Sequence, residues 1–176
     1  MRTERPGSDE YNPYYARYIA LVPDGDIVRT LRAQFSITIR LLEGVRPEQE
    51  LYRYAEGKWS IREVVGHLID TEAMFTGRIL WIARQPEIAL PGMDQDLWTE
   101  RGGANDRELA DLIETWGTVR DFTVAVLDSL PDFVWGNRGM ASDSPVTVRA
   151  MPWMIAGHAR YHRELLKSDY GVIAGD

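Results

Sequence analysis

Apolar residues recur at helical intervals in four separate stretches of the chain. From 26 to 44 they return every three or four positions, and Gly44 follows as a natural stop. The second stretch starts at Ser60, which forms a capping-box pattern with Glu63, and Pro86 ends it. A third runs from 105 to 130, with Asn105 as the start, and a fourth from 149 to 168. The pattern therefore predicts four helices.

Each of the first three predicted helices has one apolar face. The first face contains Ile27, Leu31, Phe35 or Gln34, Ile39 and Leu42; the second contains Ile61, Val64, Val65, Leu68, Phe75, Ile79 and Ile82; the third contains Leu109, Leu112, Ile113, Trp116, Val119, Phe122, Val126 and Leu127. Helices of this length that are apolar on one side pack against one another in bundles. The predicted fold is an all-α four-helix bundle with long connections.

The segments outside these helices are rich in proline, glycine or aromatic residues. Residues 1–24 carry three prolines and four tyrosines, which predicts an extended N-terminal arm that packs by its aromatic rings. The bundle domain is expected to span 25–170, with a C-terminal tail at 171–176. The connections at 86–105 and 131–148 are predicted to be non-helical, with only a brief extended piece at 146–148.

Composition narrows the possible functions. The chain has 176 residues, 44% of them hydrophobic, which is enough for one core without cross-links. It has no cysteine, so disulfides, thiolate metal sites and a catalytic cysteine are excluded. The net charge of -7 argues against nucleic-acid binding. With neither a secretory signal nor an apolar span of bilayer length in the sequence, a cytoplasmic protein without membrane contact is expected.

The chain contains three histidines, and two of them lie four positions apart in the segment "GHARYHREL". On a helix, His158 and His162 differ by about 40° and share a side with apolar residues. Two imidazoles so placed can turn nitrogens toward one ion, as in many zinc sites. His67 lies at the rim of the apolar face of the second helix and would complete a three-nitrogen site open to water or substrate. The competing interpretation is a surface pair or hydrogen-bonded interior histidines.

Other residues near the histidines are candidates for the surroundings of such a site. Glu72 falls on an apolar face, so it either accepts an imidazole N–H or pairs with an arginine, and we favour the imidazole. Trp59, Trp153 and Tyr161 would wall a pocket over the ion, with ordinary core packing as the alternative for both tryptophans. The Tyr161 hydroxyl is also placed to reach a ligand of the metal.

Two segments carry a resemblance to a known family. The segment "KWSIREVVGHLIDTE" (58–72) resembles the Trp-Ser-x-x-Glu-x-x-x-His-Leu-x-Asp-x-Glu signature of the DinB/YfiT-like superfamily, and "WMIAGHARYHRELL" (153–166) resembles its closing His-x3-His helix. Order and spacing agree over roughly residues 25–168. The resemblance implies a four-helix bundle, usually homodimeric, in which His67, His158 and His162 hold a divalent ion such as zinc or nickel.

The resemblance also restricts the expected activity. Characterised members include thiol-dependent transferases and isomerases that use mycothiol or bacillithiol, and proteins described as metal-dependent hydrolases. We therefore expect an enzyme that activates a thiol or water toward a small-molecule substrate. Because the chain lacks cysteine, the thiol route requires an external low-molecular-weight thiol. The alternative is a non-enzymatic stress-response or dimerising scaffold with structural or vestigial histidines.

Overall fold

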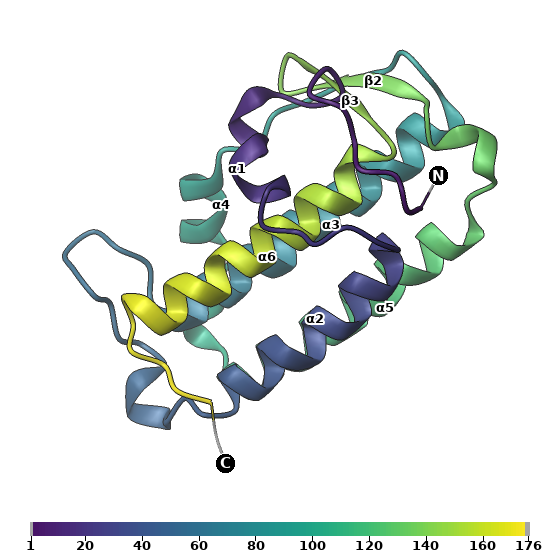
Figure 1. The fold of residues 1–176 in the computed structure, drawn as a ribbon. Helices are drawn as coiled ribbons and strands as arrows, with labels where there is room; N and C mark the ends of the chain where they lie inside the picture. Colours follow the sequence, from purple (N-terminus) through teal and green to yellow (C-terminus); the bar gives the residue numbers. More distant parts are fainter. Residues whose placement is uncertain (1, 175–176) are drawn as a thin grey trace.

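A computed structural model describes residues 2–174; Met1 and the last two residues of the predicted tail, 175–176, lie outside this range. The helices are α1 (Ala16–Ile19), α2 (Ile27–Leu42), α3 (Ile61–Arg84), α4 (Gln95–Arg101), α5 (Leu109–Ser129) and α6 (Ala150–Ser168). A small sheet contains β1 (Ala89–Leu90), β2 (Arg138–Ala141) and β3 (Ser144–Thr147). Figure 1 shows the four long helices as the body of the molecule, with α1, α4 and the sheet added to it. The predicted four-helix bundle is confirmed.

The four long helices are not arranged in simple chain order. Helix α3 packs against α5 and α6, and α2 packs against the same two helices (Figure 1). On α3, Glu72 precedes Thr76; on α5, their partners Trp116 and Thr123 follow in the same order. Helices α3 and α5 therefore run parallel. Parallel neighbours need a connection that returns along the bundle. Residues 85–108 supply this return, which explains the length of that connection.

The start of α3 follows the predicted capping box. The Ser60 hydroxyl accepts a hydrogen bond from the Glu63 amide, and the Glu63 carboxylate accepts one from the Ser60 amide. Asn105, predicted to start the third helix, lies instead in a 3-10 turn, and α5 begins only after Glu108. Its amide is committed elsewhere, because it accepts from Ser60 and donates to Glu63. Asn105 therefore joins two helix starts.

The core agrees with the apolar faces of the sequence, with one clear exception. All seven residues predicted for the apolar face of α3 are buried. Phe122 of α5, predicted to be in the core, is 53% exposed, whereas Arg120 and Thr123 are buried. The difference arises because α5 lies between α2 and α3, and the side that faces them carries polar groups that find partners there. Hydrophobicity alone could not identify those partners.

The connections are more structured than predicted. Residues 131–148 form the antiparallel pair β2–β3, and β1 pairs in parallel with β2. Ser142 and Asp143 have positive φ angles at the turn, which suits a tight hairpin. Helix α4 occupies part of the 86–105 connection, which the sequence predicted to be non-helical. None of the helices in residues 2–174 combines the length and hydrophobicity that a bilayer crossing requires.

The N-terminal arm is folded onto the bundle and is not extended throughout. It contains a 3-10 turn at Pro13–Tyr15 and then α1, which packs on α6. Glu10 anchors it: its carboxylate accepts hydrogen bonds from Arg149 and Thr147, and its carbonyl oxygen accepts one from the Thr147 amide. The arm is thus fixed near the start of α6, the helix that carries two of the histidines.

Candidate metal centre

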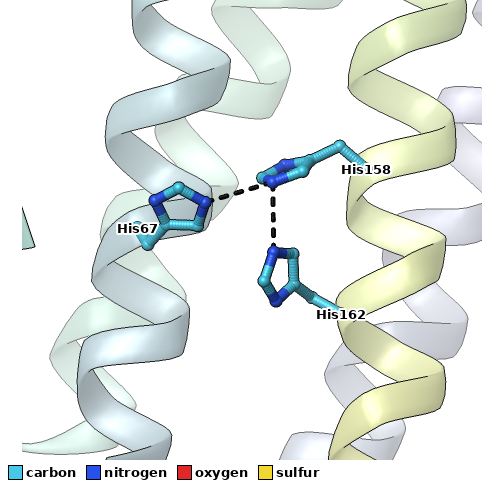
Figure 2. A group of neighbouring side chains, drawn as sticks. All are labelled: His67, His158 and His162. Carbon is cyan, nitrogen blue, oxygen red and sulfur yellow. Dashed lines mark hydrogen bonds between the residues drawn. The ribbon is translucent and has the colours of Figure 1, made fainter. Parts of the chain in front are cut away.

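The three histidines converge in the bundle, as Figure 2 shows. His67 comes from α3, and His158 and His162 come from successive turns of α6. The Nε2 atom of His158 lies 3.1 Å from Nε2 of His67 and 3.1 Å from Nε2 of His162. The three residues can offer ligand atoms that all lie within 4.8 Å of one another. The structure therefore brings together the three residues that the sequence predicted as metal ligands.

These imidazoles are buried and uncharged at neutral pH. Burial lowers the pKa of His67 to about 4. Burial, with a smaller effect of the neighbouring His67, lowers the pKa of His162 to about 3. The pKa of His158 is also well below its usual value, because of burial and the two other imidazoles. Neutral imidazole is the form that coordinates metals, so the nitrogens need no deprotonation near pH 7.

The donor set fits a divalent ion. Zinc–imidazole bonds of about 2.0–2.1 Å place two nitrogens of a tetrahedral site about 3.3 Å apart, close to the two 3.1 Å separations found here. Without an ion the hydrogen-bonding capacity of the three rings is poorly satisfied. Nε2 of a neutral His158 carries either one N–H or one lone pair, but it faces two ring nitrogens. One cation that accepts all three lone pairs resolves this conflict. Three imidazoles suit zinc, nickel, copper or iron(II).

The orientation of the rings is set mainly by packing. The Trp59 ring lies 4.6 Å from the His67 ring and is stacked at 6.5 Å on His162. Tyr161 meets His162 edge-on at 5.3 Å. His67 Nδ1 has the Thr71 hydroxyl at 3.5 Å, whereas His162 Nδ1 is buried and bonds to no residue within 2–174. The aromatic walls therefore do much of the positioning that hydrogen bonds provide in other sites.

Two of the predicted neighbours do not belong to the site. Glu72 accepts two hydrogen bonds from Arg120 and one from the Trp116 indole, so the favoured imidazole partner was wrong. Glu72 is only 2% exposed, and an ionised carboxylate that is so deeply buried needs a full positive charge beside it, which arginine provides. Trp153 is fully buried in the core under Arg5, and it lines none of the cavities that border the histidines. For Trp153 the alternative of core packing is the one found.

Three cavities border the histidines; the two larger ones meet at His158, and the third, of about 40 Å³, borders His67 alone. Of the two larger cavities, one of about 400 Å³ is bordered by His158 and His162, and its walls include Tyr14, Arg17, Tyr18, Tyr54, Lys58, Trp59 and Tyr161. The other, of about 290 Å³, is bordered by His67 and His158. His158, Tyr14, Tyr18 and Gln95 line both of these larger cavities. Volumes of this order accommodate small molecules.

The sequence did not identify Tyr18 as part of this region. Tyr18 is 5% exposed, and its ring meets the His158 ring edge-on at 5.3 Å. Its hydroxyl accepts a hydrogen bond from Arg17 at 2.9 Å. Burial raises the pKa of Tyr18, and Tyr14 adds to this effect. The available signal was the cluster of tyrosines in the arm, but nothing in the sequence indicated that the arm folds back over α6.

Known proteins resemble this chain both in sequence and in fold. The model of the DinB superfamily matches residues 30–166. This chain belongs to the DinB superfamily. Among solved structures, YfiT from Bacillus subtilis, described as a probable metal-dependent hydrolase with an unusual four-helix bundle topology, superimposes with a TM-score of 0.71 at 16% identity, covering 97% of this chain and 95% of its own. The sequence has no match among curated proteins.

Two further structures share the fold of this DinB-superfamily protein. A mycothiol-dependent maleylpyruvate isomerase has a TM-score of 0.67 at 14% identity, covering 84% of this chain and 60% of its own. A DinB-like protein from Bacillus subtilis has a TM-score of 0.59 at 21% identity, covering 81% and 87%. At these identities the likeness establishes the fold, and the site must be argued from the residues of this chain.

Proposed function

We propose that this protein is a divalent-metal-dependent enzyme that transfers a low-molecular-weight thiol to an electrophilic small molecule. The observation that carries the proposal is the convergence of three neutral imidazole nitrogens where two cavities meet. His67, His158 and His162 would hold zinc or nickel. Such an ion supplies Lewis acidity, which favours ionisation of a thiol or a water molecule near neutral pH.

The residues of the chain divide the remaining work. The larger cavity carries Arg17 and Lys58 beside several aromatic rings, a lining suited to a polar thiol cosubstrate. The smaller cavity would hold the electrophile on the other side of His158. In the reaction the thiol releases its proton to solvent water, sulfur forms a bond to the electrophilic carbon, and the bond from that carbon to the leaving group breaks, so that the leaving group departs with its electron pair. The walls orient the two reactants toward each other.

Two cavities favour a reaction between two organic substrates, but hydrolysis is a second candidate. The observation in its favour is the similarity to YfiT over 97% of this chain, since that protein is described as a probable metal-dependent hydrolase. In a hydrolase, water would replace the thiol and one organic substrate would suffice. Consumption of thiol by the protein therefore separates the two activities.

The experiment supplies zinc- or nickel-reconstituted protein with mycothiol, bacillithiol, glutathione or coenzyme A and a model electrophile, and follows loss of free thiol. We expect turnover with at least one thiol, and its loss in the His158→Ala variant. Arg160→Ala is the matched control, because Arg160 lies on the same helix and lines a different surface hollow. Turnover that survives His158→Ala would remove the histidines from the mechanism.

The non-enzymatic scaffold makes the opposite prediction. A scaffold with structural histidines would give no turnover with any thiol and no hydrolysis of ester or amide substrates, even when an ion is bound. If the folded, metal-loaded protein behaves in this way across the panel, the proposed enzyme is the wrong interpretation.

A further inference from the structure

Three arginines are buried in the described part of the chain, and only one of them has no carboxylate partner. Arg120 is bound by Glu72, and Arg163 is bound by Glu164. Arg78 is 7% exposed, but no carboxylate within residues 2–174 lies within 4 Å of its guanidinium. Because a buried cation is costly without a counter-charge, this difference needs an explanation.

The guanidinium of Arg78 is only partly satisfied by its surroundings. Its Nη2 atom donates to the carbonyl oxygen of Pro91 and, at 3.4 Å, to the hydroxyl of Ser142. The Phe75 ring lies 5.6 Å from Cζ. Nε and Nη1 of Arg78 donate to no residue within 2–174. They are nevertheless not fully buried. These two donors therefore keep some exposure, and Arg78 lines both the cavity of about 290 Å³ that His67 and His158 border and a hollow of about 10 Å³ beside it.

The larger cavity that Arg78 lines, of about 290 Å³, is the smaller of the two that border His158. His67, Thr71, Phe75 and Arg78 follow one another at spacings of four, four and three on α3, and all four line it. The separation of eleven positions between His67 and Arg78 corresponds to about 16 Å along the helix axis. The wall between them includes Met74, Phe75 and Tyr15, which are apolar or aromatic. The cavity thus has an imidazole end, an apolar middle and a cationic end.

We propose that Arg78 binds the carboxylate of a substrate whose apolar body lies along this cavity and whose reactive end reaches the histidines. An arginine presents two parallel N–H donors that match the two oxygens of a carboxylate. A bound carboxylate would also supply the counter-charge that the chain itself does not provide. The assignment deepens the proposed function, since it makes the electrophile an organic acid.

Two further observations support this position for an anion. Burial lowers the pKa of Arg78, which reflects the free energy lost when the charge leaves water, and a bound anion would offset that loss. Asp96 lines only the larger of the two cavities that border His158, so it does not face the guanidinium. The smaller cavity has no acidic residue in its lining.

The test uses phenylacetate and its neutral isostere phenylacetamide, titrated into the full chain by calorimetry with and without reconstituted zinc. The wild-type protein should bind the carboxylate more tightly than the amide. Arg78→Gln should weaken phenylacetate by about tenfold or more and leave the amide almost unchanged. Arg84→Gln, which removes the same charge from an exposed position of the same helix, should keep the preference. Arg78→Lys, which retains charge without the planar fork, should be intermediate.

Three results would overturn the assignment. The first is equal phenylacetate affinity in wild type and folded Arg78→Gln. The second is equal weakening of acid and amide, which would mean that Arg78 only shapes the cavity. The third is a carboxylate preference that disappears on metal removal but survives Arg78→Gln, which would place the acid on the ion. If Arg78→Gln does not fold, Arg78→Lys decides: unchanged affinity for the acid overturns the proposal. A preference for the acid that depends on Arg78 in a chain that binds no metal would uphold the anion site and reject the proposed enzyme.

Discussion

A Cβ atom at position 157 would overlap the backbone carbonyl of Tyr18, so Gly157 is what allows α1 to lie directly on α6. The contact occurs one residue before His158, and it presses Tyr18 against the ring of that histidine. Gly66 stands in the same relation to His67, since a Cβ there would crowd Ala104. Each side of the centre is thus approached closely by another segment at a glycine.

Replacing Gly157 by alanine should therefore separate α1 from α6. We expect a loss of about 1–3 kcal/mol in the free energy of unfolding, as for other overpacked positions, and reduced thiol consumption because Tyr18 is displaced. Gly77→Ala is the control: Gly77 is also in a long helix but has no neighbour within 4 Å of an added Cβ. Urea unfolding of both variants makes the comparison. Equal stability of the two would contradict the close contact.

The pair of Glu72 and Arg120 should matter for stability and not for metal binding. Both side chains are 3% exposed, and the guanidinium also donates to the carbonyl of Leu31 on α2. Breaking a buried pair on one side typically costs about 3–5 kcal/mol, so Glu72→Gln should be strongly destabilised. Its metal content, measured on folded protein at low temperature, should equal that of wild type. If Glu72→Gln lost the ion and kept its stability, Glu72 would belong to the metal site after all.

Acid should release the N-terminal arm through Glu10. Burial raises the pKa of Glu10, but hydrogen bonds from Arg149, the Gly7 amide and Thr147 outweigh burial and leave this pKa below its usual value of 4.5. A lowered carboxyl pKa gives stability that is present above pH 4.5 and is lost as the pH falls through the folded-state pKa. The difference in unfolding free energy between wild type and Glu10→Gln should therefore shrink below pH 4.5. A difference that stays constant with pH would disprove this role for the ionised carboxylate.

Removal of the ion should lower thermal stability. A ligand present at a hundred times its dissociation constant stabilises the folded state by about 2.7 kcal/mol, which corresponds to a change in Tm of about 5–10 °C for a chain of this size. Dialysis against a chelator should lower Tm by this order, and added zinc or nickel should restore it. The chelator should have no such effect on His158→Ala. A chelator effect of the same size in that variant would locate the ion elsewhere.

The fold was predictable where periodicity and local chemistry agree. The four long helices and the Ser60 capping box depend on residues close in sequence, so a pattern of apolar positions was enough to find them. The three histidines were predictable because His158 and His162 share one helix face and His67 is the only other imidazole. The homodimer and the cytoplasmic location expected from the sequence remain predictions.

Most of what could not be predicted depends on contacts between distant segments, and the rest lies in short elements. Tyr18 enters the site because α1 packs on α6 across about 140 positions of sequence, and Arg120 is buried because Glu72 lies opposite on another helix. The helix α4 and the β2–β3 hairpin are short elements whose local signals were hidden among glycine and proline. None of these relations leaves a periodic trace in a single sequence. These contacts and short elements become visible only in the three-dimensional structure.

The metal content of the protein purified without a histidine tag tests most directly whether the three histidines form a metal centre. Elemental analysis after reconstitution with zinc or nickel should give about one ion per chain for wild type and for Arg160→Ala, and close to none for folded His67→Ala or His158→Ala. A wild-type content far below one ion per chain, or an unchanged content in the histidine variants, would contradict the claim that His67, His158 and His162 form a metal centre.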